Sequence, residues 1–457
     1  MKKQLLTILS LGLCMAAGAQ KEVPAPVPPL PTAHQVEWQK LETYAFIHFG
    51  PNTFGDREWG YGDADPMSFN PTRLDTEQWA KTIKEAGMKG VILTAKHHDG
   101  FCLWPTKYTD YSVRNSAYKD GKGDIVGELA AACQKYGLKL GLYLSPWDRH
   151  QAFYSTPLYV EYFHAQLEEL LTQYGPIFEV WFDGANGGDG WYGGANETRK
   201  IDRTTYYQWP ETYRMIRELQ PHCLIWNDGG DRGDLRWVGT EAGNVGETNW
   251  SLLNKEGDVP YEQLHYGVED GDVWVPGETN TSIRPGWFYH DTENEHVKSL
   301  SKLMDTYYKS VGRNSTLLLN FPVAPNGRIH PTDSLRGIAF AKMIQEVFKD
   351  DLSKQATVTT TAHGETSVTT LLDFKQPTAF NRFVAEEDIR WNECARCRVL
   401  IRIAIASDGG IVDERMTVCG LEVGGVVVAL APDQDRGTIW LNVLEPLRER
   451  RSVETDA

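Results

Sequence analysis

Short apolar runs alternate with longer amphipathic segments over most of the chain. Six runs have the length and the aromatic or branched composition of buried strands: residues 44–49, 90–95, 139–144, 177–182, 223–226 and 316–319. A helix is predicted between the first two runs, because Trp79, Ile83 and Ala86 recur at helical spacing. Asp75 is its predicted N-cap, and Gly87 is the residue predicted to end it. Three further helices are predicted at 124–137, 157–174 and 210–219. The pattern indicates an α/β protein.

Repeated strand–helix units require a parallel sheet covered by helices, either a closed (β/α)8 barrel or an open doubly wound sheet. Polar or aromatic residues follow almost every predicted strand: His48, 96–99, 145–148, Asp183, 227–228 and Asn320. A barrel gathers all such strand ends at one mouth, whereas an open sheet uses only those near its switch point. Because no glycine-rich phosphate-binding motif follows the first strand, we predict a (β/α)8-type barrel over residues 35–350.

The start of the chain has the features of a secretory signal. Lys2 and Lys3 precede an apolar stretch, and the small residues 17–19 offer a cleavage site, so residues 1–19 are predicted to be a signal peptide. Residues 20–34 form a Pro-rich linker. No later stretch is long and apolar enough to span a membrane. We therefore expect a protein exported to the periplasm or the extracellular space.

The end of the chain differs from the rest. Residues 351–457 are predicted to form a small C-terminal β-sandwich domain, since 355–372 is rich in Thr and Val with short alternations. After residue 390 the composition changes: no lysine follows Lys375, while 391–457 contain eight arginines and three of the seven cysteines. We interpret this as a domain that is incomplete or altered, and a frameshifted reading frame is one hypothesis for it.

Composition narrows the class of ligand. The net charge of −16 argues against nucleic acid, which is bound through basic surfaces. Fifteen Trp and twenty Tyr suit a protein that stacks aromatic rings on sugars, although core packing explains most of them. The cysteines show no metal-binding spacing.

Asp183 is the first candidate for chemistry. It follows the buried run 177–182, where an ionised carboxylate is unfavourable unless it is paired or used. The carboxyl end of a strand in an α/β protein is also where ligands bind, which makes Asp183 a candidate nucleophile. The alternative is an ordinary turn or helix-cap aspartate before Gly184.

Several motifs at strand ends, taken in order, resemble the family 29 α-L-fucosidases. They are His48-Phe49-Gly50, Glu58-Trp59, His97-His98-Asp99-Gly100-Phe101, Tyr143-Leu144-Ser145-Pro146-Trp147 and Trp181-Phe182-Asp183-Gly184. The segments 236–241, 282–287 and 317–320 are similar to the subfamily selective for fucose in α-1,3 and α-1,4 branches. The resemblance covers roughly residues 35–390.

The resemblance implies a retaining glycoside hydrolase without a cofactor, in which Asp183 is the nucleophile and Glu241 the acid/base. Such a pair of carboxyl groups is expected to lie about 5–5.5 Å apart. Thr240 precedes Glu241 where the family usually has Asn. Because Glu247 and Glu278 lie in similar loop-like surroundings, each remains an alternative acid; Glu278 could instead bind a hydroxyl or pair with Arg284.

The resemblance also implies a set of substrate-binding residues: His48, Glu58, Trp59, His97, His98, Tyr143, Trp181 and Trp287. The adjacent His97 and His98 could instead suggest a metal pair, but neighbouring strand residues point to opposite faces and no third ligand accompanies them. We therefore predict no metal. Arg232 and Arg236 are equal candidates for reaching the sugar or a carboxylate.

We therefore expect an exo-acting α-L-fucosidase whose partner is a fucosylated oligosaccharide or glycoconjugate. The alternatives are a retaining barrel glycosidase for a related sugar and a sugar-binding barrel without activity.

Overall fold

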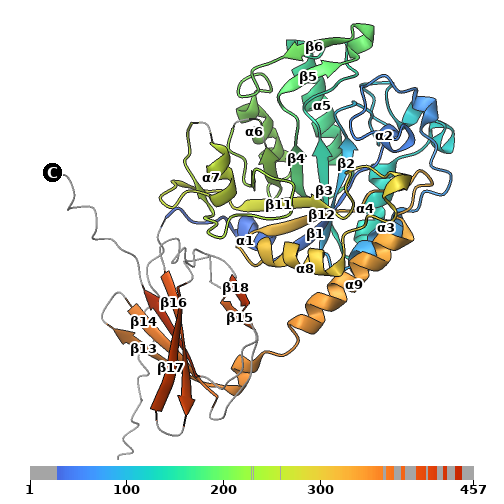
Figure 1. The fold of residues 1–457 in the computed structure, drawn as a ribbon. Coiled ribbons are helices and arrows are strands. Elements are labelled where there is room, and N and C mark those ends of the chain that lie inside the picture. Colours follow the sequence, from blue (N-terminus) through green and yellow to red (C-terminus); the bar gives the residue numbers. More distant parts are fainter. Residues whose placement is uncertain are drawn as a thin grey trace, which may run out of the picture.

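The computed structural model describes residues 28–374, apart from 228, 230, 258 and 364–366, and beyond them residues 382–385, 398–407, 410–418, 426–429 and 438–444. The predicted signal peptide lies outside the described residues. Eight strands form one sheet in the order β7-β4-β3-β2-β1-β12-β11-β8, and each neighbouring pair is parallel. A parallel bridge from Trp226 to Leu235 joins its two edges, so the sheet closes into the predicted barrel (Figure 1).

Six of the eight barrel strands lie where the apolar runs predicted them, within a few residues: β1 Thr43–Ile47, β2 Gly90–Lys96, β3 Lys139–Leu144, β4 Ile177–Phe182, β7 Leu224–Asn227 and β12 Thr316–Asn320. The strands β8 (Arg236–Trp237) and β11 (Gly277–Ser282) were not predicted. β11 has the polar sequence Gly-Glu-Thr-Asn-Thr-Ser, yet all six residues are buried. Glu278 and Asn280 face the barrel interior, while Thr279 and Thr281 alternate with them and face the other side of the strand.

Helices cover the outside of the barrel (Figure 1). They are α3 Thr76–Glu85, α4 Ile125–Tyr136, α5 Pro157–Gln173, α6 Trp209–Leu219, α8 Leu300–Lys309 and α9 Pro331–Val347. The predicted N-cap Asp75 accepts a hydrogen bond from the Gln78 N–H at 2.9 Å. Asp124, the first residue of the predicted helix 124–137, accepts one from the Gly127 N–H at 2.9 Å in the same way. Gly137 ends α4 in the left-handed region.

The barrel interior has its own core, separate from the layer between sheet and helices. Tyr44, Phe46, Trp181 and Leu318 belong to it. Helix α1 (Ala33–Gln39) contributes Trp38, whose indole N–H donates to the Tyr44 hydroxyl at 3.1 Å and to Glu179 at 3.0 Å. The amino-terminal end of the barrel is thereby closed, which leaves the carboxyl-terminal end for a ligand.

The C-terminal region forms antiparallel sheets, as the sequence predicts for a β-rich domain (Figure 1). A five-stranded sheet has the order β13-β14-β19-β16-β17, with bounds Thr357–His363, Ser367–Asp373, Thr438–Leu444, Arg398–Ser407 and Gly410–Val418. β15 (Arg382–Ala385) pairs with β18 (Val426–Ala429). The reading-frame hypothesis for 391–457 stays a prediction.

Among the described residues, no helix has both the length and the apolar character of a membrane span.

Candidate active site

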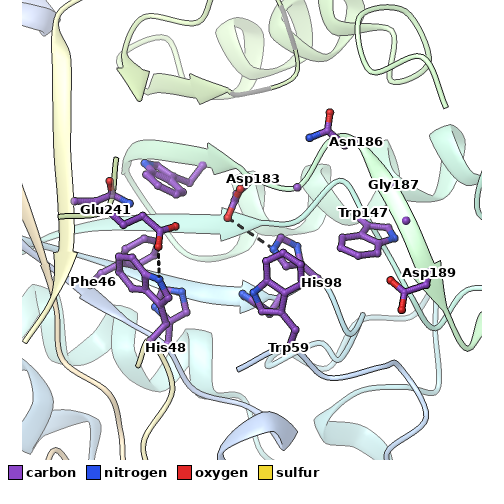
Figure 2. Close-up of a pocket in the computed structure, with 16 residues that line it drawn as sticks. Phe46, His48, Trp59, His98, Trp147, Asp183, Asn186, Gly187, Asp189 and Glu241 are labelled. Carbon is purple, nitrogen blue, oxygen red and sulfur yellow. Dashed lines mark hydrogen bonds and ion pairs between the residues drawn. The ribbon is translucent and has the colours of Figure 1, made fainter. Parts of the chain in front are cut away.

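A cavity of about 360 Å³ opens at the carboxyl ends of the barrel strands. This volume is near the lower end of the range for small-molecule sites, about 300–1,000 Å³. Most of the residues predicted from the sequence line it: His48, Trp59, His97, His98, Trp181, Asp183, Glu241 and Trp287 (Figure 2). They come from the ends of several strands and from the loops that follow them, so closure of the barrel brings them together.

Asp183 follows the last residue of β4 and is directed into the cavity (Figure 2). The Tyr143 hydroxyl donates to its Oδ2 at 3.2 Å, and His98 Nε2 is 3.8 Å from the same oxygen. Burial raises the pKa of Asp183 to about 6, while the bonds from Tyr143 and the Gly184 N–H oppose that rise. Its side chain is still 37% exposed, so a ligand can reach the carboxylate.

The backbone at position 184, directly after Asp183, requires glycine. Its φ is +80°, and a Cβ at this position would lie 2.4 Å from His98 Cε1. Any larger residue would displace the imidazole that faces Asp183. The Asp-Gly pair is therefore required by the close approach of two strand ends.

The three histidines of the cavity are held as neutral imidazoles. Burial lowers the pKa of His48 and of His98 to about 3, and that of His97 well below its usual range. The chain turns after β2 ends at Lys96, so His97 and His98 both line the cavity, with ring centroids 4.2 Å apart. The opposite-face argument against a metal pair assumes that the strand continues, so it does not apply to two residues that follow the end of β2.

Hydrogen bonds orient two of these rings. His48 Nδ1 lies 2.9 Å from Asn320 Oδ1, and His98 Nδ1 lies 2.8 Å from Ser145 Oγ. Since the Ser145 hydroxyl donates to the Trp147 carbonyl at 2.8 Å, it accepts from His98 Nδ1–H. His98 Nε2 then presents a lone pair on the side of Asp183, where it can accept from a sugar hydroxyl.

Glu241 lies in the loop after β8 and lines the same cavity. Among the described residues its carboxylate receives one side-chain hydrogen bond, from the Trp287 indole N–H at 3.0 Å. Burial raises the pKa of Glu241, and the charges of Asp183 and Glu58 raise it further. The two carboxyl groups are therefore close enough to influence each other's ionisation.

The two alternative acids lie elsewhere. Glu247 is 89% exposed and forms an ion pair with Arg313 at 3.4 Å. Glu278 is buried inside the barrel, where it accepts from the Trp181 indole N–H at 2.9 Å and from the Tyr44 hydroxyl. Neither lines the cavity, so the geometry favours Glu241 among the three.

The arginines considered from the sequence hold loops in place. Arg236 donates to the carbonyls of Leu264 and Val275, and Arg232 donates to those of Asn254 and Gly257. Neither lines the cavity. Arg284 does not pair with Glu278 as considered above: the buried Arg284 forms an ion pair with Asp333 at 2.8 Å. Asp333 lies in the first turn of α9, which the sequence pattern does not place near this loop.

Two predicted binding residues lie just outside the cavity lining. Tyr143 contributes through its hydroxyl, which bonds Asp183. The Glu58 carboxylate accepts the backbone N–H groups of Trp287 at 2.7 Å and Phe288 at 3.1 Å. Glu58 therefore anchors the loop that carries Trp287, and its contact with substrate stays a prediction.

Sequence reasoning missed other lining residues, among them Phe46, Trp147, Asn280 and the segment 186–189. Trp147 ends a motif that was singled out, and the glycine-rich insertion 187–196 is expected from the sequence to be one of the loops around the aglycone. This insertion forms a hairpin of β5 (Gly187–Gly190) and β6 (Glu197–Lys200). Asn280, in the polar strand β11, carried no signal because its neighbours do not predict a strand.

Among the described residues, no group of three or more His, Cys, Asp and Glu side chains could hold a metal ion.

Comparison with known proteins agrees with this geometry. The family model for α-L-fucosidase matches residues 30–340. α-L-Fucosidase 1 of Arabidopsis thaliana is 45% identical over 358 residues, which cover 77% of this chain and 68% of the plant protein. A crystal structure of a glycoside hydrolase 29 family member from an unknown rumen bacterium is 60% identical with a TM-score of 0.86, over 94% of this chain and 79% of that one.

A Ruminococcus gnavus family 29 fucosidase in complex with fucose is more distant, at 30% identity and a TM-score of 0.78 over 93% of both chains. The family model spans more than half of the chain, and the matched residues include the whole cavity. The chain therefore belongs to the α-L-fucosidase family and is a glycoside hydrolase of family 29.

Proposed function

We propose that the protein is an exo-acting, retaining α-L-fucosidase that removes terminal fucose from branched glycans, with Asp183 as the nucleophile and Glu241 as the acid/base. The observation that carries the proposal is the presence of both carboxyl groups in one cavity. Both have a raised pKa, and Asp183 contributes to the shift of Glu241. Two carboxyl groups on one sugar are what a double displacement requires.

In the first step, Asp183 Oδ attacks the anomeric carbon while the bond to the leaving oxygen breaks and Glu241 gives that oxygen its proton. In the second step, Glu241 takes a proton from water, the water oxygen attacks the anomeric carbon, and the bond to Asp183 breaks. Fucose leaves with its original anomeric configuration, and both carboxyl groups return to their starting states.

The cavity wall suits a 6-deoxy sugar. Phe46, Trp181 and Trp287 supply apolar surface for a methyl group, where a hydroxymethyl group would lose hydrogen bonds. Neutral His48, His97 and His98 supply directional donors and acceptors for hydroxyls without the desolvation penalty of a permanent charge.

The first experiment is hydrolysis of an aryl α-L-fucoside by the wild type and by Asp183→Ala. We expect turnover by the wild type alone, and proton NMR of the first product formed should show the α-anomer. An inert wild type or an equally active variant would overturn the assignment of Asp183. Initial release of the β-anomer would contradict the retaining mechanism alone.

Linkage selectivity and export complete the proposal. The similarity of 236–241, 282–287 and 317–320 to the α-1,3/1,4-selective subfamily supports preference for branched substrates. Comparison of kcat/KM on α-1,2-linked and branched α-1,3/4-linked fucosides tests this preference, and equal values would contradict it.

Export is the second part of the proposal. We expect the protein in the periplasmic or extracellular fraction with residues 1–19 removed. An intact amino terminus in the cytoplasm would refute this.

A further inference from the structure

The orientation of Glu241 depends on a single loop. Its only side-chain hydrogen bond among the described residues comes from Trp287 Nε1. Trp287 lies in the segment that follows β11, between the buried Arg284 and His290. Whatever holds this segment therefore also holds the carboxyl group of Glu241.

Glu58 is one of the groups that hold the segment. One carboxylate oxygen accepts the Trp287 N–H at 2.7 Å and the other accepts the Phe288 N–H at 3.1 Å. The packing is close, because a Cβ on Gly286 would lie 2.6 Å from Glu58 Oε1 and 3.1 Å from His290 Cδ2. Glycine is needed here for the approach of the carboxylate to the backbone.

His290 connects Glu58 to a second carboxylate. Its Nε2 lies 2.7 Å from Glu58 Oε1, and its Nδ1 lies 2.5 Å from Asp56 Oδ1. A neutral imidazole has one N–H and can donate to only one of them, whereas an imidazolium donates to both. The arrangement of the three groups, which we call the His290 cluster, therefore fits a protonated ring.

The charges around His290 support the protonated form. Burial lowers the pKa of His290, but the hydrogen bonds that the ring donates to Asp56 and Glu58, together with the charges of Glu58 and Glu293, outweigh it, and the net shift is upward. The nearby cation, Arg284, faces the His290 carbonyl at 3.3 Å and is neutralised by its ion pair with Asp333. The carboxylates therefore dominate the field at the ring.

We propose that His290 is a positioning residue: as an imidazolium bound between Asp56 and Glu58, it fixes the Trp287 segment and through it the proton-donating geometry of Glu241. This inference rests on the proposed role of Glu241. His290 acts through Glu58 and the Trp287 backbone, not on the sugar. Loss of its proton at high pH removes one of its two bonds and loosens the hold on Glu241.

The test compares two α-L-fucosides with different leaving groups. The dinitrophenolate of a dinitrophenyl fucoside leaves without being protonated. The sugar that leaves from an oligosaccharide needs a proton from the general acid. For His290→Gln we expect kcat/KM to fall about tenfold on the oligosaccharide and less than about twofold on the dinitrophenyl fucoside, since misplacement of a catalytic group impairs only the step it serves. His222→Gln, a histidine change at the surface between α6 and β7, is the matched control and should change neither value.

Asp56→Asn provides a second variant whose folding is not in question, since the Asp56 side chain is 78% exposed. We expect the same selective loss, smaller in size, and a lower His290 pKa in an NMR titration. Equal losses on both substrates, or no loss in either variant, would overturn the proposal. The proposed function fails separately: in that case the wild type is inert, or Glu241→Gln shows no dependence on the leaving group.

Discussion

The barrel contains two pairs of carboxyl groups at different depths, and only one of them can reach a substrate. Asp183 and Glu241 line the cavity, whereas Glu179 and Glu278 are fully buried below it. Glu179, Trp181 and Asp183 occupy alternate positions along β4 and its carboxyl end, so their side chains lie on the same side, facing the barrel interior. The Trp181 indole donates to Glu278 and its ring forms part of the cavity wall.

The deeper pair is perturbed as well, but a substrate has no access to it. Burial and the neighbouring Glu278 raise the pKa of Glu179 well above its usual range, and burial also raises the pKa of Glu278. Glu278 accepts from Tyr44 and Trp181, so it fits the ionised partner, while a protonated Glu179 donates to it. A perturbed pKa therefore identifies an unusual environment, and exposure to a cavity decides whether it is used in chemistry.

The largest difference between the pairs is expected in catalysis. Asp183→Asn should lower kcat/KM on an aryl α-L-fucoside by on the order of 10⁴-fold, about 5.5 kcal/mol, because the amide cannot form the covalent intermediate. Glu179→Gln should stay within about threefold of the wild type, because the amide keeps a donor for Glu278 and an acceptor for the Trp38 indole. A comparable loss in both variants would remove the functional distinction between the pairs.

Stability is expected to show the opposite order. Glu278→Ala leaves the buried Tyr44 hydroxyl and Trp181 indole N–H without their acceptor, which should lower the free energy of unfolding by about 2–6 kcal/mol, at roughly 1–3 kcal/mol for each group. Glu247→Ala is the matched control, since this exposed ion pair should contribute less than about 1 kcal/mol. Chemical denaturation of both variants is the measurement, and equal changes would contradict the role of the deeper pair.

The pH profile of kcat/KM should reflect the cavity pair. Below pH 6 Asp183 is protonated and cannot attack, so activity should fall about tenfold per pH unit. Tyr143→Phe removes a hydrogen bond that lowers the pKa of Asp183, and the acid limb should therefore move to higher pH. Glu179→Gln should leave this limb in place. If the acid limb moved in Glu179→Gln but not in Tyr143→Phe, the limb would belong to the deeper pair and not to Asp183.

The smallest effect is expected in the pH dependence of stability. Glu179 has a raised pKa in the folded state, so above about pH 4.5 the folded protein holds a proton that the unfolded chain has released. The free energy of unfolding should therefore decrease as the pH rises, by at most about 1.4 kcal/mol per pH unit for one proton. Glu179→Gln should flatten this slope in urea titrations between pH 5 and 8, and an unchanged slope would exclude Glu179 as its source.

Much of the fold could be predicted because its strands and helices carry local signals. The six apolar runs became barrel strands, and Asp75 and Asp124 cap helices as their spacing indicates. β8 and β11 could not be found in this way. β8 has two residues, and β11 places Glu278 and Asn280 inside the barrel, where a hydrophobic pattern gives no sign of burial.

The candidate site was predicted only in part. Strand ends and motifs identified Asp183, His48 and the residues around them, because the carboxyl end of a parallel strand is recognisable in sequence. Apart from the family resemblance, the sequence could not choose among Glu241, Glu247 and Glu278. It also could not place Glu58 against the Trp287 backbone. These depend on loops whose course no local pattern specifies.

By itself, the sequence determined the alternation of strands and helices, the barrel class and the position of a carboxylate at the end of β4. These follow from periodicity and from side-chain types that act over a few residues. The tertiary structure alone decided which carboxyl groups share a cavity and which are sealed beneath Trp181, and it alone brought His290 between Asp56 and Glu58. The contacts of His290 join residues more than two hundred positions apart, and the bond from Trp181 to Glu278 joins residues 97 positions apart; such contacts exist only after the barrel has closed.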